Sequence, residues 1–399
     1  MLILDYLLPF IVVLGVLVFV HELGHYLAAR QCRVAVQVFS IGFGPELFGF
    51  NDRAGTRWKI SAFPLGGYVK MLGDMDAASR PDANAADLPD DLHSRAFPNK
   101  TVGQRAWIVA AGPLANFLFA AIVLMILMAT QGHPFPRADV GEVIEDYPAA
   151  EAGLRPDDRI TAINDQPIDR FMDIPLAVQL AMADRYQPAP DQRVMAYNDY
   201  VALVGSVDLP PVTVRFERDG APLTLTMVPA GRTVIDTSDG VGREVPAFRL
   251  GFTAPQGAYG IGDSILLGVT ETVWLTGATL AAVGEIIAGD RGSEELGGPI
   301  RIAQMSGDVA QLGIIALLWF MALLSVNLGL INLFPIPILD GGHLLFLGVE
   351  AALGRPLSER LQDYGFRIGF ALVLTLMVFA TWNDLVNLQV FDFLSGLIS

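Results

Sequence analysis

Residues 21–25 read His-Glu-Leu-Gly-His, a pattern typical of a metal-dependent hydrolase. They stand at the end of an apolar run, 6–20. On a helix, residues four apart share a face, so His21 and His25 can bind one metal ion. Glu22 lies on a neighbouring face, where its carboxylate can take a proton from water at the metal. Because ionisable groups inside a membrane are costly, the cluster predicts hydrolytic chemistry within a lipid bilayer.

A catalytic zinc site takes three protein ligands and keeps one position open. Asp340 is the candidate third ligand, because it ends an apolar stretch, 314–339, and precedes two glycines that permit close approach. Pro335 and Pro337 should break the helix there, which is tolerated at membrane depth where the backbone lines protein or a water-filled cavity. The alternative for Asp340 is a helix-end carboxylate that faces water. Histidine and carboxylate ligands suit several divalent metals, of which we predict Zn²⁺.

The composition indicates a chain with both membrane and soluble parts. Its 399 residues are 52% hydrophobic, yet 17% are charged, which is too apolar for a soluble protein and too charged for one that is membrane throughout. The net charge of -16 argues against nucleic-acid binding, which needs a basic surface. With Cys32 as the single cysteine, no intramolecular disulfide is possible.

Four apolar segments are long enough to span a bilayer, namely 6–29, 107–130, 314–339 and 368–389. A fifth stretch, 266–288, carries Glu271, Glu285 and a polar stripe, so we interpret it as an amphipathic helix at the membrane surface, within a connector over 256–312. This count sets the depth of the candidate site. With four spans, Asp340 lies at the same depth as the histidines; with five, it would emerge on the opposite side.

The basic residues predict the orientation of the spans. They cluster beside one end of each span, at Arg30, Arg33, Lys100, Arg105, Arg355, Arg360 and Arg367. By the positive-inside rule, the loop over 31–103 lies inside, and both termini and the segment over 131–312 lie outside. The candidate site then faces the inner side of the membrane.

Two regions are predicted to be rich in β-structure. Strand-like segments over 34–71 predict β-hairpins beside the first span. The region 131–255 contains alternating strands at 212–217 and 223–227, joined by Arg218-Asp219-Gly220, a hairpin signal. We also predict disorder over 74–91 and an insertion over 188–211.

With its segments 140–144 and 152–164, the region 131–255 resembles a PDZ domain of the kind associated with bacterial proteases. Such domains bind peptide C-termini or extended segments by adding a strand to a sheet edge. The alternative is a generic β-rich domain.

Taken together, these motifs resemble the site-2 protease family of intramembrane zinc metalloproteases, in its bacterial branch. The resemblance rests on 21–25, on the segment from Asn332 to Gly341 that ends Leu-Asp-Gly, and on the PDZ region between the second and third spans. It covers almost the whole chain. It implies a polytopic α-helical membrane protein with four transmembrane helices, membrane-associated β-hairpins and a periplasmic α+β PDZ domain.

The resemblance also implies roles for individual residues. His21, His25 and Asp340 match the metal ligands of the family, and Glu22 matches its general base. Asn332 matches an asparagine that engages the substrate backbone; the alternative for Asn332 is a hydrogen bond that packs helices.

The implied activity is regulated intramembrane proteolysis in the bacterial inner membrane. The implied substrates are single-span membrane proteins, such as anti-sigma factors or remnant signal peptides. The catalytic core would comprise 1–130 and 313–399, with the periplasmic PDZ region over 131–255 between them. The best-known members carry tandem PDZ domains, whereas this sequence has one PDZ signature.

Two other functions stay open. A non-enzymatic membrane scaffold could capture peptides through its PDZ domain, although Glu22 would then have no use. A metal transporter would need further ligands along its spans, and the second and fourth spans have no acidic, His or Cys residue in their apolar cores. In the second span, Gly112 and Asn116 share one face, which we interpret as close helix packing near the site.

Overall fold

The computed structural model describes residues 2–73, 89–132, 137–183, 209–236, 243–255, 257–289 and 298–387. The chain forms two compact units, one comprising 1–126 and 264–399 and the other comprising 127–263. Most of the predicted disordered segment 74–91 and most of the predicted insertion 188–211 lie outside the described residues.

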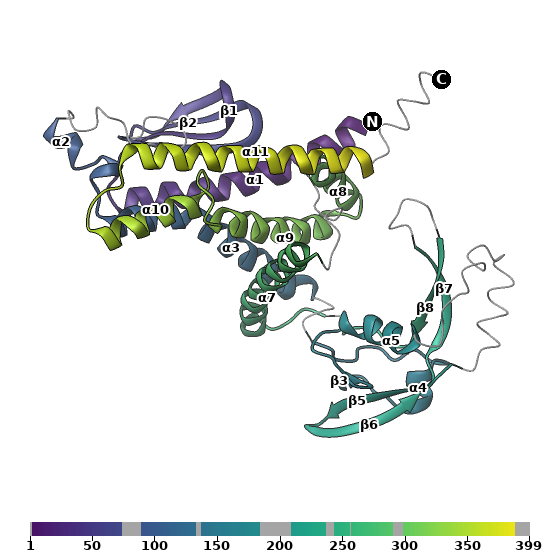
Figure 1. Ribbon diagram of the computed structural model, residues 1–399. Coiled ribbons are helices and arrows are strands. Elements are labelled where there is room, and N and C mark those ends of the chain that lie inside the picture. Colours follow the sequence, from purple (N-terminus) through teal and green to yellow (C-terminus); the bar gives the residue numbers. More distant parts are fainter. Residues whose placement is uncertain are drawn as a thin grey trace, which may run out of the picture. The chain divides into compact units, whose positions relative to one another are not determined.

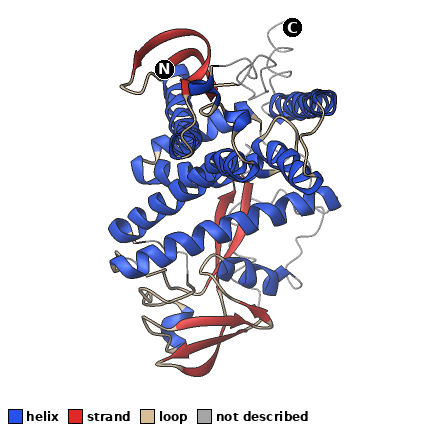
Figure 2. Ribbon diagram, turned by 90° about the vertical axis from the view of Figure 1, so that its left-hand side faces the viewer, coloured by secondary structure: helices blue, strands red, loops and turns tan. Residues whose placement is uncertain are grey.

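The first unit is mainly helical (Figures 1 and 2). Its elements, of which α3 and α7 continue across the boundary between the units, are α1 (Leu2–Gln31), α2 (Asp90–His93), the 3-10 helix η2 (Phe97–Asn99), α3 (Val102–Gln131), α7 (Ile261–Ala288), α8 (Pro299–Gln311), α9 (Ile314–Leu333), α10 (Asp340–Leu353) and α11 (Glu359–Asn387). Among the described residues, five helices are long and apolar enough to cross a membrane: α1, α3, α7, α9 and α11. The protein is therefore a polytopic membrane protein. The helix beyond the four predicted spans is α7, for which the sequence predicts a position at the membrane surface.

Helices α1 and α9 run side by side in the same direction (Figure 1). Val13 and Leu17 of α1 form an apolar cluster with Met321 of α9. Further along both helices, His21 lies beside Asp340, the residue that begins α10. The contacts of α1 therefore move from α9 to the start of α10 in the direction in which α1 runs. This brings the end of α9 to the histidine pair.

Helix α9 ends at Leu333, earlier than the predicted span 314–339, because the two prolines that follow cannot continue it. Gly341 then lies against the end of α9, since a Cβ there would be 2.2 Å from the Phe334 carbonyl oxygen. Ile338 in the connecting loop has a φ of 95°, which is a strained conformation for a β-branched residue. Helix α10, which no sequence pattern indicated, begins at Asp340 itself.

Strands β1 (Val36–Asn51) and β2 (Arg57–Met71) bend so that four stretches pair in the order 46–51, 57–61, 38–41 and 67–71. All four stretches lie within 34–71, where the sequence predicts β-hairpins. Phe39 is buried, and its ring stacks on Trp58 at 4.1 Å between centroids and meets Phe19 of α1 at 5.8 Å. Through this aromatic packing, the sheet contacts α1, the helix that carries the histidines.

Asp52, in the turn between β1 and β2, adds a polar link to α1. Its Oδ2 accepts hydrogen bonds from the Tyr26 hydroxyl at 2.9 Å and the Trp58 indole at 3.1 Å. Desolvation raises the pKa of Asp52, but these bonds and those from the Thr56 and Ala54 amides outweigh it and lower the pKa to about 2. Asp52 thus stays ionised at neutral pH and keeps accepting these bonds.

The second unit combines strands and short helices: α4 (Pro148–Ala152), β3 (Arg159–Ile163), β4 (Gln166–Pro167), α5 (Asp173–Ala183), β5 (Val212–Arg218), β6 (Ala221–Met227), β7 (Ala230–Asp236) and β8 (Arg243–Arg249). Its four-stranded sheet has the order β4-β3-β5-β6, and β7 and β8 form a separate hairpin. The predicted hairpin is β5–β6, whose turn residues Asp219 and Gly220 have φ of 52° and 78°, as a type I′ turn requires. Asp158, almost fully buried, accepts two bonds from Arg218, both of 2.7 Å.

Candidate metal centre

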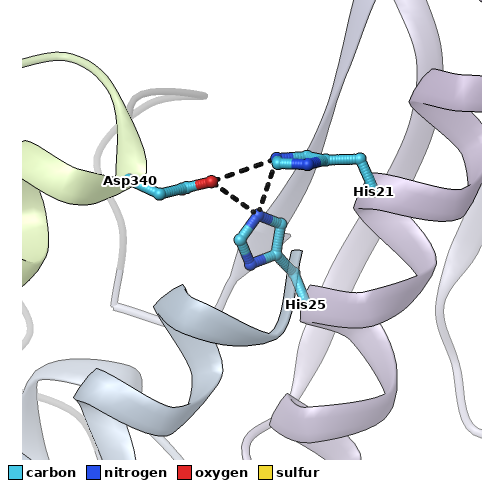
Figure 3. Close-up of side chains that lie close together, drawn as sticks. All are labelled: His21, His25 and Asp340. Carbon is cyan, nitrogen blue, oxygen red and sulfur yellow. Dashed lines mark hydrogen bonds and ion pairs between the residues drawn. The ribbon is translucent and has the colours of Figure 1, made fainter. Parts of the chain in front are cut away.

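Three side chains from two distant parts of the sequence converge on one point (Figure 3). His21 and His25 project from the same face of α1, with their Nε2 atoms 3.2 Å apart. Asp340 Oδ2 lies 3.1 Å from His21 Nε2 and 3.5 Å from His25 Nε2. Both histidines are at most 9% exposed, so the cluster is shielded from bulk solvent.

The separations between these three atoms suit a zinc ion. Zinc–ligand bonds of about 2.0–2.1 Å in a tetrahedral arrangement place neighbouring donor atoms ~3.4 Å apart, close to the three distances above. Asp340 Oδ2 has no hydrogen-bond donor among the described residues, although it is buried. Two imidazole nitrogens and one carboxylate oxygen therefore fit zinc and leave its fourth position open, as catalytic sites require.

Helix α3 orients His25. Its Nδ1 donates to the Ile108 carbonyl oxygen at 2.9 Å, which fixes the tautomer and leaves the Nε2 lone pair facing Asp340. A Cβ at Gly112 would lie only 2.2 Å from His25 Nε2, so the ring occupies space that glycine leaves free. For Gly112, the sequence favoured close helix packing near the site.

Helix α3 also contacts His21. Asn116, fully buried, places its Nδ2 3.2 Å from His21 Nδ1. This contact with His21 does not follow from the helix-packing role that the sequence favoured for Asn116. The available signal was an amide side chain in an otherwise apolar span, on the same face as Gly112.

The cluster opens into a cavity of about 210 Å³. Glu22, 8% exposed, and Asn332, in the last turn of α9, both line this cavity. All five residues that the sequence singled out for the site are therefore brought to one cavity. The sheet stretch from Gly67 to Val69 lines it too.

His343 also lines the cavity. It lies one turn after Asp340 on α10, and its ring meets Phe366 of α11 at 5.2 Å between centroids. Its place beside Asp340 depends on α10 beginning at that residue, which the sequence did not indicate.

Apolar helices around a buried cluster of two histidines and an aspartate define the class of membrane metalloproteases. The sequence pattern of peptidase family M50 matches residues 9–376. The chain is 41% identical to the "Putative zinc metalloprotease Atu1380" of Agrobacterium fabrum, over 96% of either chain. It is 36% identical to "Metalloprotease MmpA" of Caulobacter vibrioides, over 98% of either chain. With "Regulator of sigma-E protease RseP" of Salmonella typhimurium it shares 35% identity, over 96% of this chain and 98% of the relative.

The chain belongs to peptidase family M50, the site-2 protease family, which confirms the resemblance drawn from its motifs. It is a bacterial inner membrane protein of a zinc-dependent family of proteases.

Proposed function

We propose that the protein is an intramembrane zinc endopeptidase in which His21, His25 and Asp340 hold the metal. Glu22 is the general base, and Asn332 engages the substrate backbone. The observation that carries this proposal is the convergence of the three donor atoms, from helices far apart in the chain, at separations that suit one ion.

Bound at this cluster, zinc would acidify a water molecule and polarise the scissile carbonyl. The Glu22 carboxylate takes the proton of the attacking water and passes it to the nitrogen of the leaving amine. The Ile108 carbonyl holds the His25 ring in place throughout, because its bond uses Nδ1 and leaves Nε2 for the metal.

The substrate should be extended where it is cut. A helical segment keeps its carbonyls in hydrogen bonds within the helix, so a scissile carbonyl becomes free only where the helix unwinds. The stretch over 67–71 is an edge of the β1–β2 sheet, and its residues Gly67 to Val69 line the cavity. An unwound substrate segment can pair with that edge, while Asn332 hydrogen-bonds its freed backbone.

We propose four membrane spans, α1, α3, α9 and α11, with α7 in the connector over 256–312 at the membrane surface. The parallel direction of α1 and α9 supports this count, since it requires an odd number of crossings between them. Helix α3 supplies one crossing, and α7 would make two. Helix α8, with 13 residues, is too short for a further crossing, which takes ~20 residues.

We further propose that the region 131–255 is a periplasmic PDZ domain that binds peptide C-termini or extended segments. The catalytic core then comprises 1–130 and 313–399, with its site toward the cytoplasm. Basic residues near the inner ends of the four spans support this orientation. Single-span membrane proteins, such as anti-sigma factors or remnant signal peptides, are the proposed substrates. The name of the Salmonella relative, "Regulator of sigma-E protease RseP", is in keeping with the first class.

A non-enzymatic scaffold is the less favoured function. In a scaffold, a carboxylate at position 22 would gain nothing from burial beside two histidines. Its burial in the cavity, at 8% exposure, costs free energy that an acid–base role explains.

The test is Glu22→Gln in protein reconstituted with a single-span substrate. Zinc content should stay at the wild-type level, because Glu22 is not a ligand, while the cleavage rate falls ~10²–10⁴-fold. Glu285→Gln, which removes an exposed acid on α7, is the matched control and should cleave normally. Undiminished cleavage by Glu22→Gln would refute the assignment of the base.

A further inference from the structure

Asn116 has no role in the mechanism above, yet it is a fully buried amide in an otherwise apolar stretch of α3. We propose that Asn116 is a positioning residue for His21: its side-chain oxygen accepts the Nδ1–H of the imidazole and so aims Nε2 at the zinc. This inference rests on the proposed metal centre and adds to it the residue that orients one of its ligands.

His21 presents one particular ring nitrogen to the metal centre. His21 Nε2, not Nδ1, faces Asp340 Oδ2 and His25 Nε2. A metal-binding nitrogen must offer a lone pair, and a neutral imidazole carries its one proton on the other nitrogen. Nδ1 of His21 is therefore a donor, and it is buried, so it needs an acceptor.

The side-chain oxygen of Asn116 can serve as that acceptor. The atom beside His21 Nδ1 is Asn116 Nδ2, at 3.2 Å, which is itself a donor. Two donors cannot share a hydrogen bond. A half-turn of the terminal amide exchanges its two atoms and presents Oδ1, which has no hydrogen-bond partner among the described residues. The oxygen then accepts from Nδ1–H, and the nitrogen takes the position that the oxygen leaves.

Both histidines have their Nδ1 partner on α3. His25 Nδ1 donates to a main-chain oxygen of α3, that of Ile108, and His21 meets a side chain two turns further along the same helix. One helix thus orients both imidazoles. The Ser325 hydroxyl of α9 donates to the main-chain carbonyl of Asn116 at 2.9 Å, a bond that does not involve the side-chain amide. Metal-binding histidines commonly have such partners, and their loss costs ~10–100-fold in metal affinity.

The experiment measures zinc dissociation constants by chelator competition on purified full-length protein. Asn116→Leu keeps the volume and removes the acceptor, and we expect zinc to bind ~10–100-fold more weakly. Asn116→Asp supplies oxygen acceptors only, and we expect it to bind zinc as tightly as wild type or more so. Ser325→Ala, the matched control, removes a bond to the same residue's backbone and should leave the zinc affinity unchanged.

The melting temperature of each zinc-free variant separates positioning from a merely structural role. The inference is overturned if Asn116→Leu binds zinc within ~2-fold of wild type, well short of the usual loss. It is equally overturned if Asn116→Asp folds normally yet loses zinc, because the amide would then act as a donor. Should Asn116→Leu fail to fold, the Asp variant decides alone.

Asp340→Ala distinguishes failure of this inference from failure of the metal centre. Undiminished zinc in Asp340→Ala would refute the centre itself. Loss of zinc in Asp340→Ala, together with full affinity in Asn116→Leu, would refute only the role of Asn116.

Discussion

The two sides of the metal centre are built in different ways. On one side, His21 and His25 project from a regular helix, whose geometry alone sets their relative positions. On the other side, Asp340 follows a loop that contains a strained residue and two prolines. Its position depends on how that loop packs. A short motif can therefore specify two of the proposed ligands locally, while the third needs long-range packing.

The two sides should therefore respond differently to added bulk. At Gly112, beside His25, a new methyl group meets the imidazole side chain. Beside the loop, it meets main-chain atoms that cannot move without refolding the segment. Three sets of substitutions test this difference.

We expect the largest effect from Gly341→Ala, on the loop side. Its Cβ would lie 2.2 Å from the Phe334 carbonyl oxygen and 2.3 Å from that of Leu333. The free energy of unfolding of the zinc-free protein should fall by ~3 kcal/mol, the cost of overpacking, and zinc affinity should fall with it. Chemical denaturation and chelator competition measure the two quantities.

Gly348→Ala is its matched control, because Gly348 lies on the same helix with no described neighbour within 4 Å of a new Cβ. It should gain up to ~1 kcal/mol through helix propensity. If both variants unfold alike, the loop is not packed as described.

An intermediate effect is expected from Gly112→Ala, on the histidine side. The new methyl group would displace the His25 ring, since Nε2 lies 2.2 Å away. Zinc affinity should fall ~10–100-fold, as for other disturbances of ligand orientation, while the zinc-free protein melts near the wild-type temperature. Gly103→Ala, on the same helix with no described neighbour within 4 Å, should change neither quantity appreciably. If Gly112→Ala lost much stability but bound zinc normally, the two sides would not differ as proposed.

The smallest effect concerns the strain at Ile338, whose φ is 95°. Glycine adopts this conformation freely, whereas alanine retains most of the strain. Ile338→Gly should therefore be more stable than Ile338→Ala by ~1 kcal/mol, the usual size of such strain. Equal stabilities, or a more stable alanine variant, would mean that the loop does not hold this conformation.

Much of the site could be predicted from the sequence, because its strongest signals are local. The spacing of His21 and His25 needs only helical periodicity, and the break before Asp340 needs only the chemistry of proline. The requirement that three ligands share one depth then related two distant segments. The hairpin turn at Asp219 and Gly220 was predictable for the same reason, since its residue types select the turn.

What escaped prediction depends on contacts between elements. Which face of α3 meets the histidines is decided by packing, so Gly112 and Asn116 read as ordinary helix contacts. The start of α10 at Asp340, and with it the place of His343, follows from how the loop folds back on α9. The apolar content of α7 is compatible with either a span or a surface helix, and composition alone does not separate them.

The depth of the centre has a consequence for the products of the proposed reaction. His21 precedes the last residue of α1, Gln31, by ~15 Å at the helical rise per residue. Each cut at that level creates an ammonium and a carboxylate where the original chain had an uncharged peptide bond. Fresh chain ends of this kind are poorly solvated by hydrocarbon, so hydrolysis itself drives both fragments out of the bilayer interior.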